Sequence, residues 1–285
     1  MNRKKFFLLF FIILSILFIY FSDFDDQIKY KIFHNKENNL IKNNSFIYEF
    51  KEIKEIKDNL SGVTYSPKTN TLFAISNSPR YIYELDKEGN FLREIYLDGF
   101  KDTEDITHIK DDLFAIIDEE LNGFFILKID EDTKIIYKND SLKEFIVDVK
   151  TFENFGLEGI SYDLTNDIFY LVNERNPKKV ISVKGFMNNN PIVVKENFKI
   201  VENNDYLGDF AAIYFDNKSK NIYILSEETT LLGRVDDKKN FSKFLDLSAN
   251  KISLAITNPE GITKDSDENF YIVGEPNHFL SIKKR

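Results

Sequence analysis

The sequence predicts an all-β protein that folds as a β-propeller, and three observations predict it. Beyond residue 45, β-rich runs of about 5 to 8 residues alternate with turn residues, as antiparallel meanders require. Five segments of similar sequence recur there, at intervals that suit blades of four strands. The 28 Phe and 14 Tyr favour pleated, half-buried surfaces, although a genome rich in A and T would enrich Phe as well.

The chain begins with the features of a membrane anchor. A basic cluster at residues 3–5 precedes a largely apolar run at 6–21, and acidic residues follow. As a helix the run would span roughly 24 Å, close to the ~30 Å hydrocarbon core, and snorkelling lysines make up the difference. We expect a cytoplasmic stub and signal-anchor transmembrane helix over 1–22, contacting inner-membrane lipid through 6–21, with the rest of the chain outside the cytoplasm. A cleaved signal peptide is the alternative, but no small-x-small site follows the run.

Residues 23–44 are polar and lack clear periodicity. We interpret them as a linker between the membrane and a folded domain at 45–285. His34 lies in this linker, where a solvated histidine is commoner than a metal ligand.

The folded domain contains five repeats. Each has a first strand, a turn cluster such as SPKTN or DLTND, a second apolar strand and a third strand. Fourth strands are expected in FLREIYL, TKIIYK, PIVVKENF and FSKFLDL. The first strands align on Val63, Ile106, Ile160, Ile213 and Ile262.

The last repeat ends after its third strand, so its fourth strand must come from elsewhere. The segment FIYEFKEI at 46–53 can supply it. A ring closed in this way hides the sheet edges that would otherwise promote aggregation. Five repeats with this closure predict five blades. Six blades remain the alternative, since the insertion SLKEFIVDVKTF at 141–152 has room for a degenerate element.

Acidic residues recur at matching places in the repeats. In a propeller the first strand of each blade lines the channel and the second runs antiparallel to it, so the start of one and the end of the other share a face. One mouth of the channel should therefore be acidic. The candidate metal ligands there are Glu104, Glu158, Glu174, Glu227, Glu260 and Glu275, and the candidate ligand-binding residues are Asn77, Arg80, Asn173, Arg175 and His278.

Clustered carboxylates repel one another unless a cation, an arginine or a raised pKa relieves them. Oxygen ligands without Cys and with few His suit a hard cation, and calcium is the possible cofactor. The competing interpretation is that these charges are solvated or paired around a wet pore. Arg80 and Arg175 would clamp an anionic group or pair with neighbouring carboxylates.

The segments SGVTYSPKTNTLFAISNSPRYIYELDKEGNFLREIYLDGF, EDITHI, LEGISYD and PEGIT resemble the SdiA-regulated protein family over about residues 45–285. The resemblance implies a β-propeller, usually behind an N-terminal membrane anchor, with no firmly assigned activity. In general form the chain is also similar to calcium-dependent phytase and esterase-like propellers. It departs from the repeat pattern at Ala211–Ala212, which favours a site biased toward Glu104, Glu158 and Glu260.

Composition excludes several functions. A net charge of −9 argues against nucleic-acid binding, and the absence of Cys excludes thiolate chemistry. No nucleophile elbow, phosphate loop or H-x-x-x-H zinc motif is present. His108 lies in a first strand, and His278 is the best single proton-transfer candidate although a structural role is commoner.

These observations favour a binding module for a cation, a small ligand or an envelope protein. The alternative is an enzyme, a calcium-assisted phosphoesterase or esterase, in which the metal polarises the substrate and carboxylates act as bases. Such an enzyme should carry many basic residues beside the acidic mouth, and few Lys or Arg are expected there.

Overall fold

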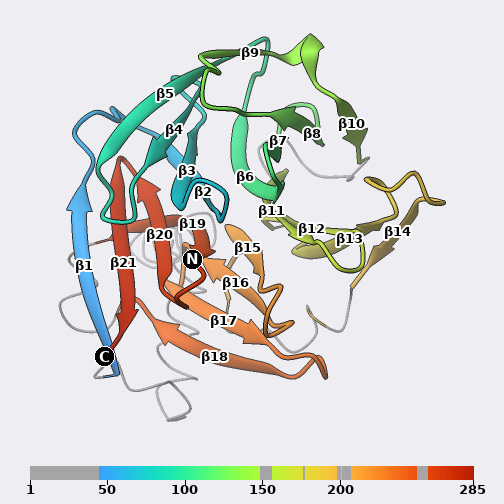
Figure 1. Cartoon of the computed structure of the whole chain (residues 1–285). Coiled ribbons are helices and arrows are strands. Elements are labelled where there is room, and N and C mark those ends of the chain that lie inside the picture. Colours follow the sequence, from blue (N-terminus) through green and yellow to red (C-terminus); the bar gives the residue numbers. More distant parts are fainter. Residues whose placement is uncertain (1–44, 148–155, 176, 198–199, 201–206, 249–255) are drawn as a thin grey trace, which may run out of the picture. The chain divides into compact units, whose positions relative to one another are not determined.

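The computed structural model describes residues 45–147, 156–175, 177–197, 200, 207–248 and 256–285. Five sheets of mainly antiparallel strands are arranged around a common centre, each forming one blade of a β-propeller (Figure 1). The prediction of a five-bladed, all-β propeller is confirmed.

The first two blades follow the predicted strand order for their inner three strands. Blade 1 consists of β2 (Leu60–Ser66), β3 (Thr71–Ser76), β4 (Tyr81–Leu85) and β5 (Phe91–Asp98), with β9 (Ile135–Tyr137) added at its outer edge. Blade 2 consists of β6 (Thr103–Lys110), β7 (Leu113–Asp118), β8 (Gly123–Lys128) and β10 (Lys143–Ile146).

The remaining three blades have four strands each. Blade 3 consists of β11 (Leu157–Asp163), β12 (Ile168–Asn173), β13 (Lys179–Lys184) and β14 (Val193–Glu196). Blade 4 consists of β15 (Ala212–Phe215), β16 (Ile222–Ser226), β17 (Leu231–Val235) and β18 (Phe241–Asp246). Blade 5 consists of β19 (Asn258–Lys264), β20 (Phe270–Glu275), β21 (His278–Lys284) and β1 (Phe46–Glu52).

The ring closes as the sequence predicts. Strand β1 pairs antiparallel with β21, from Phe46 opposite Lys284 to Glu52 opposite His278. Figure 1 shows the blue first strand beside the red last strands. Because the two ends of the domain share one sheet, opening the ring requires breaking a complete strand ladder.

The predicted fourth strand of blade 2 is wrong. Strand β9, which lies in the segment TKIIYK, instead pairs in parallel with β5 of blade 1, with Tyr96 opposite Ile135. The insertion that left a sixth blade open supplies the true fourth strand, β10. Phe145 of β10 packs against Phe124 of β8, with the ring centroids 5.5 Å apart.

Aromatic and aliphatic side chains fill the spaces between blades. Between blades 2 and 3, the rings of Phe124 and Phe169 lie 4.6 Å apart, and Phe186 packs against both. Similar clusters join blade 1 to blades 2 and 5, and blade 4 to blade 5. The high Phe and Tyr content therefore forms the inter-blade core, where large rings bridge two sheets.

The inner strands approach closely at one level, which we call the waist and define by Gly62, Asp105, Gly159, Ala212 and Gly261. A Cβ at Gly62 would lie 2.6 Å from the Cα of Asp105, and one at Gly261 would lie 2.8 Å from the Cα of Gly62. At positions 62 and 261 only glycine permits the backbones to approach this closely, because it has no Cβ. The waist separates the two ends of the central channel.

The predicted anchor at 1–22 and linker at 23–44 lie outside the described residues. Among the residues that are described, no helix combines the length and the apolar character needed to cross a membrane.

Candidate acidic site at one mouth of the channel

Each of the three central glutamates lies at a β-bulge. In blade 3 the ladder passes from Leu157 opposite Asn173 to Gly159 opposite Val172, so that Glu158 has no partner. The ladder skips Glu260 in the same way in blade 5, and Glu104 lies in a similar irregularity of blade 2. A bulge bends the strand and changes the direction of the extra side chain. A β-bulge at the same place in blades 2, 3 and 5 thus presents one glutamate side chain from each of these blades.

The register also places the ends of the second strands at this mouth. Thr103 at the start of β6 is opposite Asp118 at the end of β7, and Asn258 of β19 is opposite Glu275 of β20. The carboxylates that follow the second strands therefore lie beside those that begin the first strands. We call this group the acidic mouth, and it contains Asp102, Glu104, Glu119, Glu158, Glu174, Glu227, Glu260 and Glu275.

Three of these carboxylates form a close cluster. Asp102, Glu104 and Glu119 each offer an oxygen atom, and the three oxygens lie within 4.8 Å of one another. Burial, together with the charges of Asp102 and Glu119, raises the pKa of Glu104 to about 8. Burial and Asp102 likewise raise the pKa of Glu119 to about 7. These oxygens have the chemistry and spacing of hard-cation ligands.

The cluster is tied to the neighbouring blades by hydrogen bonds. The side-chain amide of Asn77 donates to Glu104 Oε1 at 3.1 Å, and the amide of Gly156 donates to Glu119 Oε1 at 2.7 Å. Both carboxylates also interact with the Asp102 side chain. The predicted ligand residue Asn77 thus positions a carboxylate of the mouth.

Glu158 and Glu260 extend the cluster across the channel. Burial raises the pKa of Glu158 well above its usual range, and the charges of Glu104, Glu119, Glu174 and Glu260 add to the shift. The pKa of Glu260 is raised by burial and by a group of acids that includes Glu227 and Glu104. Each glutamate therefore disfavours ionisation of the others, as expected of carboxylates that share a small volume.

Blade 4 contributes acids that are arranged differently, because Ala211 stands where the other blades carry a bulged residue. Burial and nearby Asp209 raise the pKa of Glu227 to about 7. Asp209 is fully buried and accepts hydrogen bonds through Oδ1 from the Ser226 hydroxyl and the Glu228 amide. Burial also raises the pKa of Glu275, at the rim of blade 5, with a contribution from Asp58.

One arginine is held at the rim between blades 3 and 4. Arg175 forms ion pairs with Glu174 beside it and, at 2.5 Å between Nη1 and Oε1, with Glu228 of blade 4. Although burial opposes its charge, these two glutamates keep the pKa of Arg175 above its usual range. The sequence leaves two roles open for Arg175, binding of an anion or pairing with carboxylates, and the structure shows it paired with carboxylates.

Three predicted ligand-binding residues contact protein groups. Arg80 donates from Nη1 to the Lys101 carbonyl at 3.3 Å. The Asn173 side-chain amide donates to two carbonyls of its own loop, those of Arg175 and Pro177. His278 packs its ring 5.2 Å from that of Phe50 on the outer strand of blade 5, and burial lowers its pKa. Each of the three also has one buried polar atom without a hydrogen-bond partner among the described residues, namely Arg80 Nε, Asn173 Oδ1 and His278 Nδ1.

Sequence reasoning did not select Asp102 and Asp105, although both flank Glu104 in the segment DTEDIT. Asp102 belongs to the carboxylate cluster. Asp105 occupies the place of the glycine in the first, third and fifth repeats, and it is buried in the waist. The sequence shows that Asp105 departs from the repeat pattern, but the role of this residue follows only from its contacts in the folded structure.

Comparisons with known proteins agree with this architecture. A family model described as SdiA-regulated matches residues 37–283. A chain of a nidogen/laminin complex is 12% identical, with 76% of this chain and 73% of that chain covered and a TM-score of 0.50. Luciferin-regenerating enzyme is 9% identical, with 83% and 95% covered and a TM-score of 0.50. A protein of unknown function from Bacteroides thetaiotaomicron is 14% identical, with 80% and 59% covered and a TM-score of 0.51. Identities this low indicate a shared fold and nothing about activity.

Proposed function

This chain belongs to the SdiA-regulated family, and from the carboxylates at its channel mouth we propose that it is a binding module for a hard divalent cation, with calcium as the first candidate. The single observation that carries the proposal is the cluster of Asp102, Glu104 and Glu119, whose oxygens lie within 4.8 Å of one another.

Electrostatics supports a cation at this position. The pKa of Glu104 is about 8 and that of Glu119 about 7, and burial together with neighbouring acids raises both. A divalent cation would reverse the repulsion, since each carboxylate is stabilised in its ionised form by the nearby positive charge. Binding and folding stability are then coupled, because folding brings together the start of β6 and the end of β7, which carry the three carboxylates.

The alternative, calcium-assisted hydrolysis of phosphoesters or esters, has less support. Such a mechanism needs a positive group to hold the anionic substrate and stabilise its developing charge. The two arginines expected for that task have other partners, since Arg175 pairs with Glu174 and Glu228 and Arg80 donates to a carbonyl. Binding of a cation, with an unknown small ligand or envelope protein as further partner, is therefore the function we favour.

Calcium should stabilise the full-length protein. At a free concentration one hundred times the dissociation constant, binding contributes about 2.7 kcal/mol, which corresponds to a rise of about 5 to 10 °C in melting temperature. Calorimetric titration of metal-free protein, followed by thermal unfolding, measures both effects. The Glu104→Gln/Glu119→Gln variant, which alters two of the three carboxylates of the cluster, should lose them, and Glu88→Gln, which alters an exposed turn residue, should keep them. Absence of heat and of stabilisation in the unmodified protein would overturn the proposal.

We also propose that residues 6–21 anchor the propeller in the cell membrane, with the domain outside the cytoplasm. The basic cluster before the apolar run supports this orientation. The full chain should remain with the membrane pellet after alkaline carbonate extraction, whereas a variant without residues 1–22 should be released. Added protease should digest the domain from the periplasmic side only. Release of the full chain by carbonate would exclude an integral anchor.

A further inference from the structure

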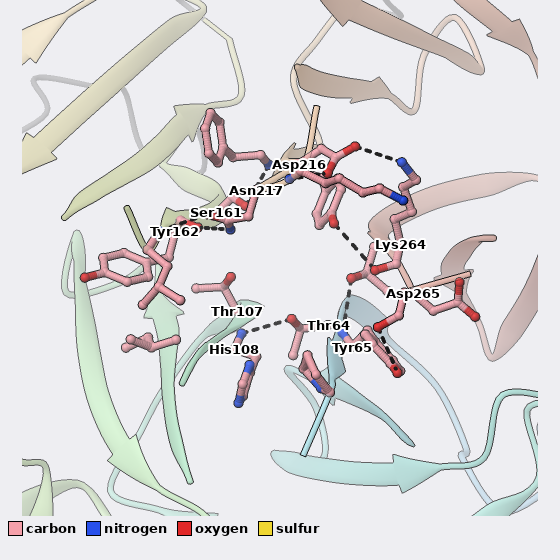
Figure 2. A pocket seen from close by; sticks show the side chains of 18 of the residues that line it. Thr64, Tyr65, Thr107, His108, Ser161, Tyr162, Asp216, Asn217, Lys264 and Asp265 are labelled. Carbon is pink, nitrogen blue, oxygen red and sulfur yellow. Dashed lines mark hydrogen bonds and ion pairs between the residues drawn. The ribbon is translucent and has the colours of Figure 1, made fainter. Parts of the chain in front are cut away.

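The end of the channel opposite the acidic mouth contains a cavity of about 390 Å³, which we call the distal cavity. Figure 2 shows its lining, which comes from the ends of the five inner strands and the turns that follow them. The volume is within the range of small-molecule pockets, near its lower end. Its central lining residues are Thr64, Thr107, Ser161, Tyr214, Thr263 and Lys264.

Hydroxyl groups occupy one equivalent position in every repeat, directly after the residue on which the first strands align. Three of them accept a backbone hydrogen bond from the next blade. Thr64 accepts from the His108 amide at 2.9 Å. Thr263 accepts from the Tyr65 amide at 3.1 Å, and Ser161 accepts from the Phe215 amide at 2.8 Å.

These three hydroxyls retain their O–H protons, because each acts as an acceptor in the bond to the neighbouring strand. Each can therefore also donate to a ligand in the cavity. In the part of the chain that the structure describes, the Thr107 hydroxyl has no hydrogen-bond partner, although it lines the same space (Figure 2). The cavity thus offers several hydroxyl groups around one centre.

The ionic groups of the cavity compensate one another. Lys264 and Asp216, whose side chains are each 5% exposed, form an ion pair at 2.8 Å. Lys264 also pairs with Glu268, which in turn pairs with Lys218. Asp265 pairs with Lys87, and burial lowers the pKa of His108, so that it adds no charge near neutral pH. An ion of either sign would have to compete with pairs that are already formed.

Aromatic side chains complete the walls. Tyr214 is partly exposed and lines the cavity, and its hydroxyl donates to the Lys264 carbonyl at 3.5 Å. Tyr162 and Phe215 also border the cavity, but their rings pack against Phe169 and Tyr170. The Tyr214 ring can contact the C–H surface of a ligand, whereas hydroxyls and the Glu268 carboxylate form hydrogen bonds with its polar edge. The lining therefore combines apolar faces, hydroxyl groups and balanced charge.

We propose that the distal cavity binds one small, uncharged polyhydroxyl compound of about monosaccharide size. Its hydroxyls supply donors and acceptors together, which match the hydroxyls of Thr107 and its neighbours on one side and the carboxylate of Glu268 on the other. The absence of net charge in the lining favours neutral over ionic ligands. This site lies across the waist from the acidic mouth and does not depend on cation binding there.

Saturation-transfer NMR tests this proposal on the full-length protein in a detergent that has no sugar headgroup. The neutral probes are glucose, galactose, N-acetylglucosamine and myo-inositol, and the charged probes are glucuronate and glucosamine. We expect at least one neutral probe to receive saturation and both charged probes to receive less. Thr107→Phe, which fills the cavity, should abolish the transfer, whereas Glu158→Gln at the other mouth should leave it unchanged.

Thr107→Val keeps the side-chain shape and removes one hydroxyl, so it should weaken binding by up to about tenfold while the melting temperature stays near that of the unmodified protein. This variant remains informative if Thr107→Phe does not fold. Transfer to none of the probes would overturn the proposal, as would transfer that persists in a folded Thr107→Phe variant or stronger transfer to the charged probes.

Discussion

Replacing Asp105 by alanine is expected to lower the free energy of unfolding by about 3 to 6 kcal/mol. The Asp105 carboxylate is 4% exposed and accepts hydrogen bonds from the Ile106 amide and from the Ile160 amide of blade 3, both at 2.8 Å. It also accepts a bond from the Val63 amide of blade 1. One side chain thus joins three inner strands at the waist. Without it, three buried amides lose their partner, and each costs about 1 to 3 kcal/mol.

Denaturant titration at pH 7, followed by circular dichroism, measures this loss. Asp105→Asn keeps one acceptor oxygen and the side-chain volume, so it should cost less than Asp105→Ala. Asp237→Ala is the matched control, because it removes an exposed aspartate from a turn of blade 4. A loss below about 1 kcal/mol for Asp105→Ala would contradict the role of this carboxylate at the waist, since it would equal a single ordinary hydrogen bond.

The fold was predictable because its signals are local and repeated. Alternating apolar runs, turn clusters and the missing last strand each constrain the chain over a few residues, and together they fix five blades and their closure. The outer strand of blade 2 was not predictable in this way. TKIIYK has the composition of a strand, but its pairing with β5 of blade 1 depends on contacts between distant segments.

The repeats predict which strand ends carry the carboxylates of the acidic mouth, but not how those side chains are oriented. Placing Glu158 and Glu174 on one face needs only the antiparallel order of two strands. The bulge that leaves Glu158 out of the ladder depends on the register of both strands, which the residue pattern does not specify. The ion pair of Arg175 with Glu228 joins two blades and is likewise a tertiary property.

The lining of the distal cavity corresponds to a sequence pattern that the sequence-based prediction did not interpret. Thr64, Thr107, Ser161, Tyr214 and Thr263 follow the five alignment residues directly. A polar group at one position of every inner strand is unusual in a buried channel wall, where apolar residues would otherwise be expected. At Thr64, Ser161 and Thr263 the explanation is hydrogen bonding between neighbouring blades, which becomes visible only once the strands are placed around the ring.

Metal-free protein should become less stable as the pH rises from about 6.5 to 8. The folded-state pKa of Glu104 is about 8, and that of Glu119 and Glu227 is about 7. An unfolded glutamate titrates near 4.3, so between these values the folded protein binds more protons than the unfolded chain, and stability falls with pH. Each titrating group contributes up to about 1.4 kcal/mol per pH unit. Below about pH 6.5 the lowered pKa of His108 acts in the opposite direction, which is why the window begins there.

Thermal unfolding across this window, with a chelator present, should give a fall in melting temperature on the order of 5 to 10 °C. Glu104→Gln should raise the melting temperature at pH 8 and flatten the dependence, because a neutral amide removes one of the repelling charges and keeps the side-chain shape. Glu88→Gln should change neither, since Glu88 is exposed in a turn. Saturating calcium should remove the part of the slope that comes from Glu104 and Glu119 if the cation occupies this cluster. A flat profile in the chelated protein would mean that the carboxylates of the mouth are already solvated or paired. If calcium leaves the slope unchanged, the glutamates repel one another as expected, but no cation binds at their site. This outcome would therefore support the raised pKa values and contradict the proposed cation binding.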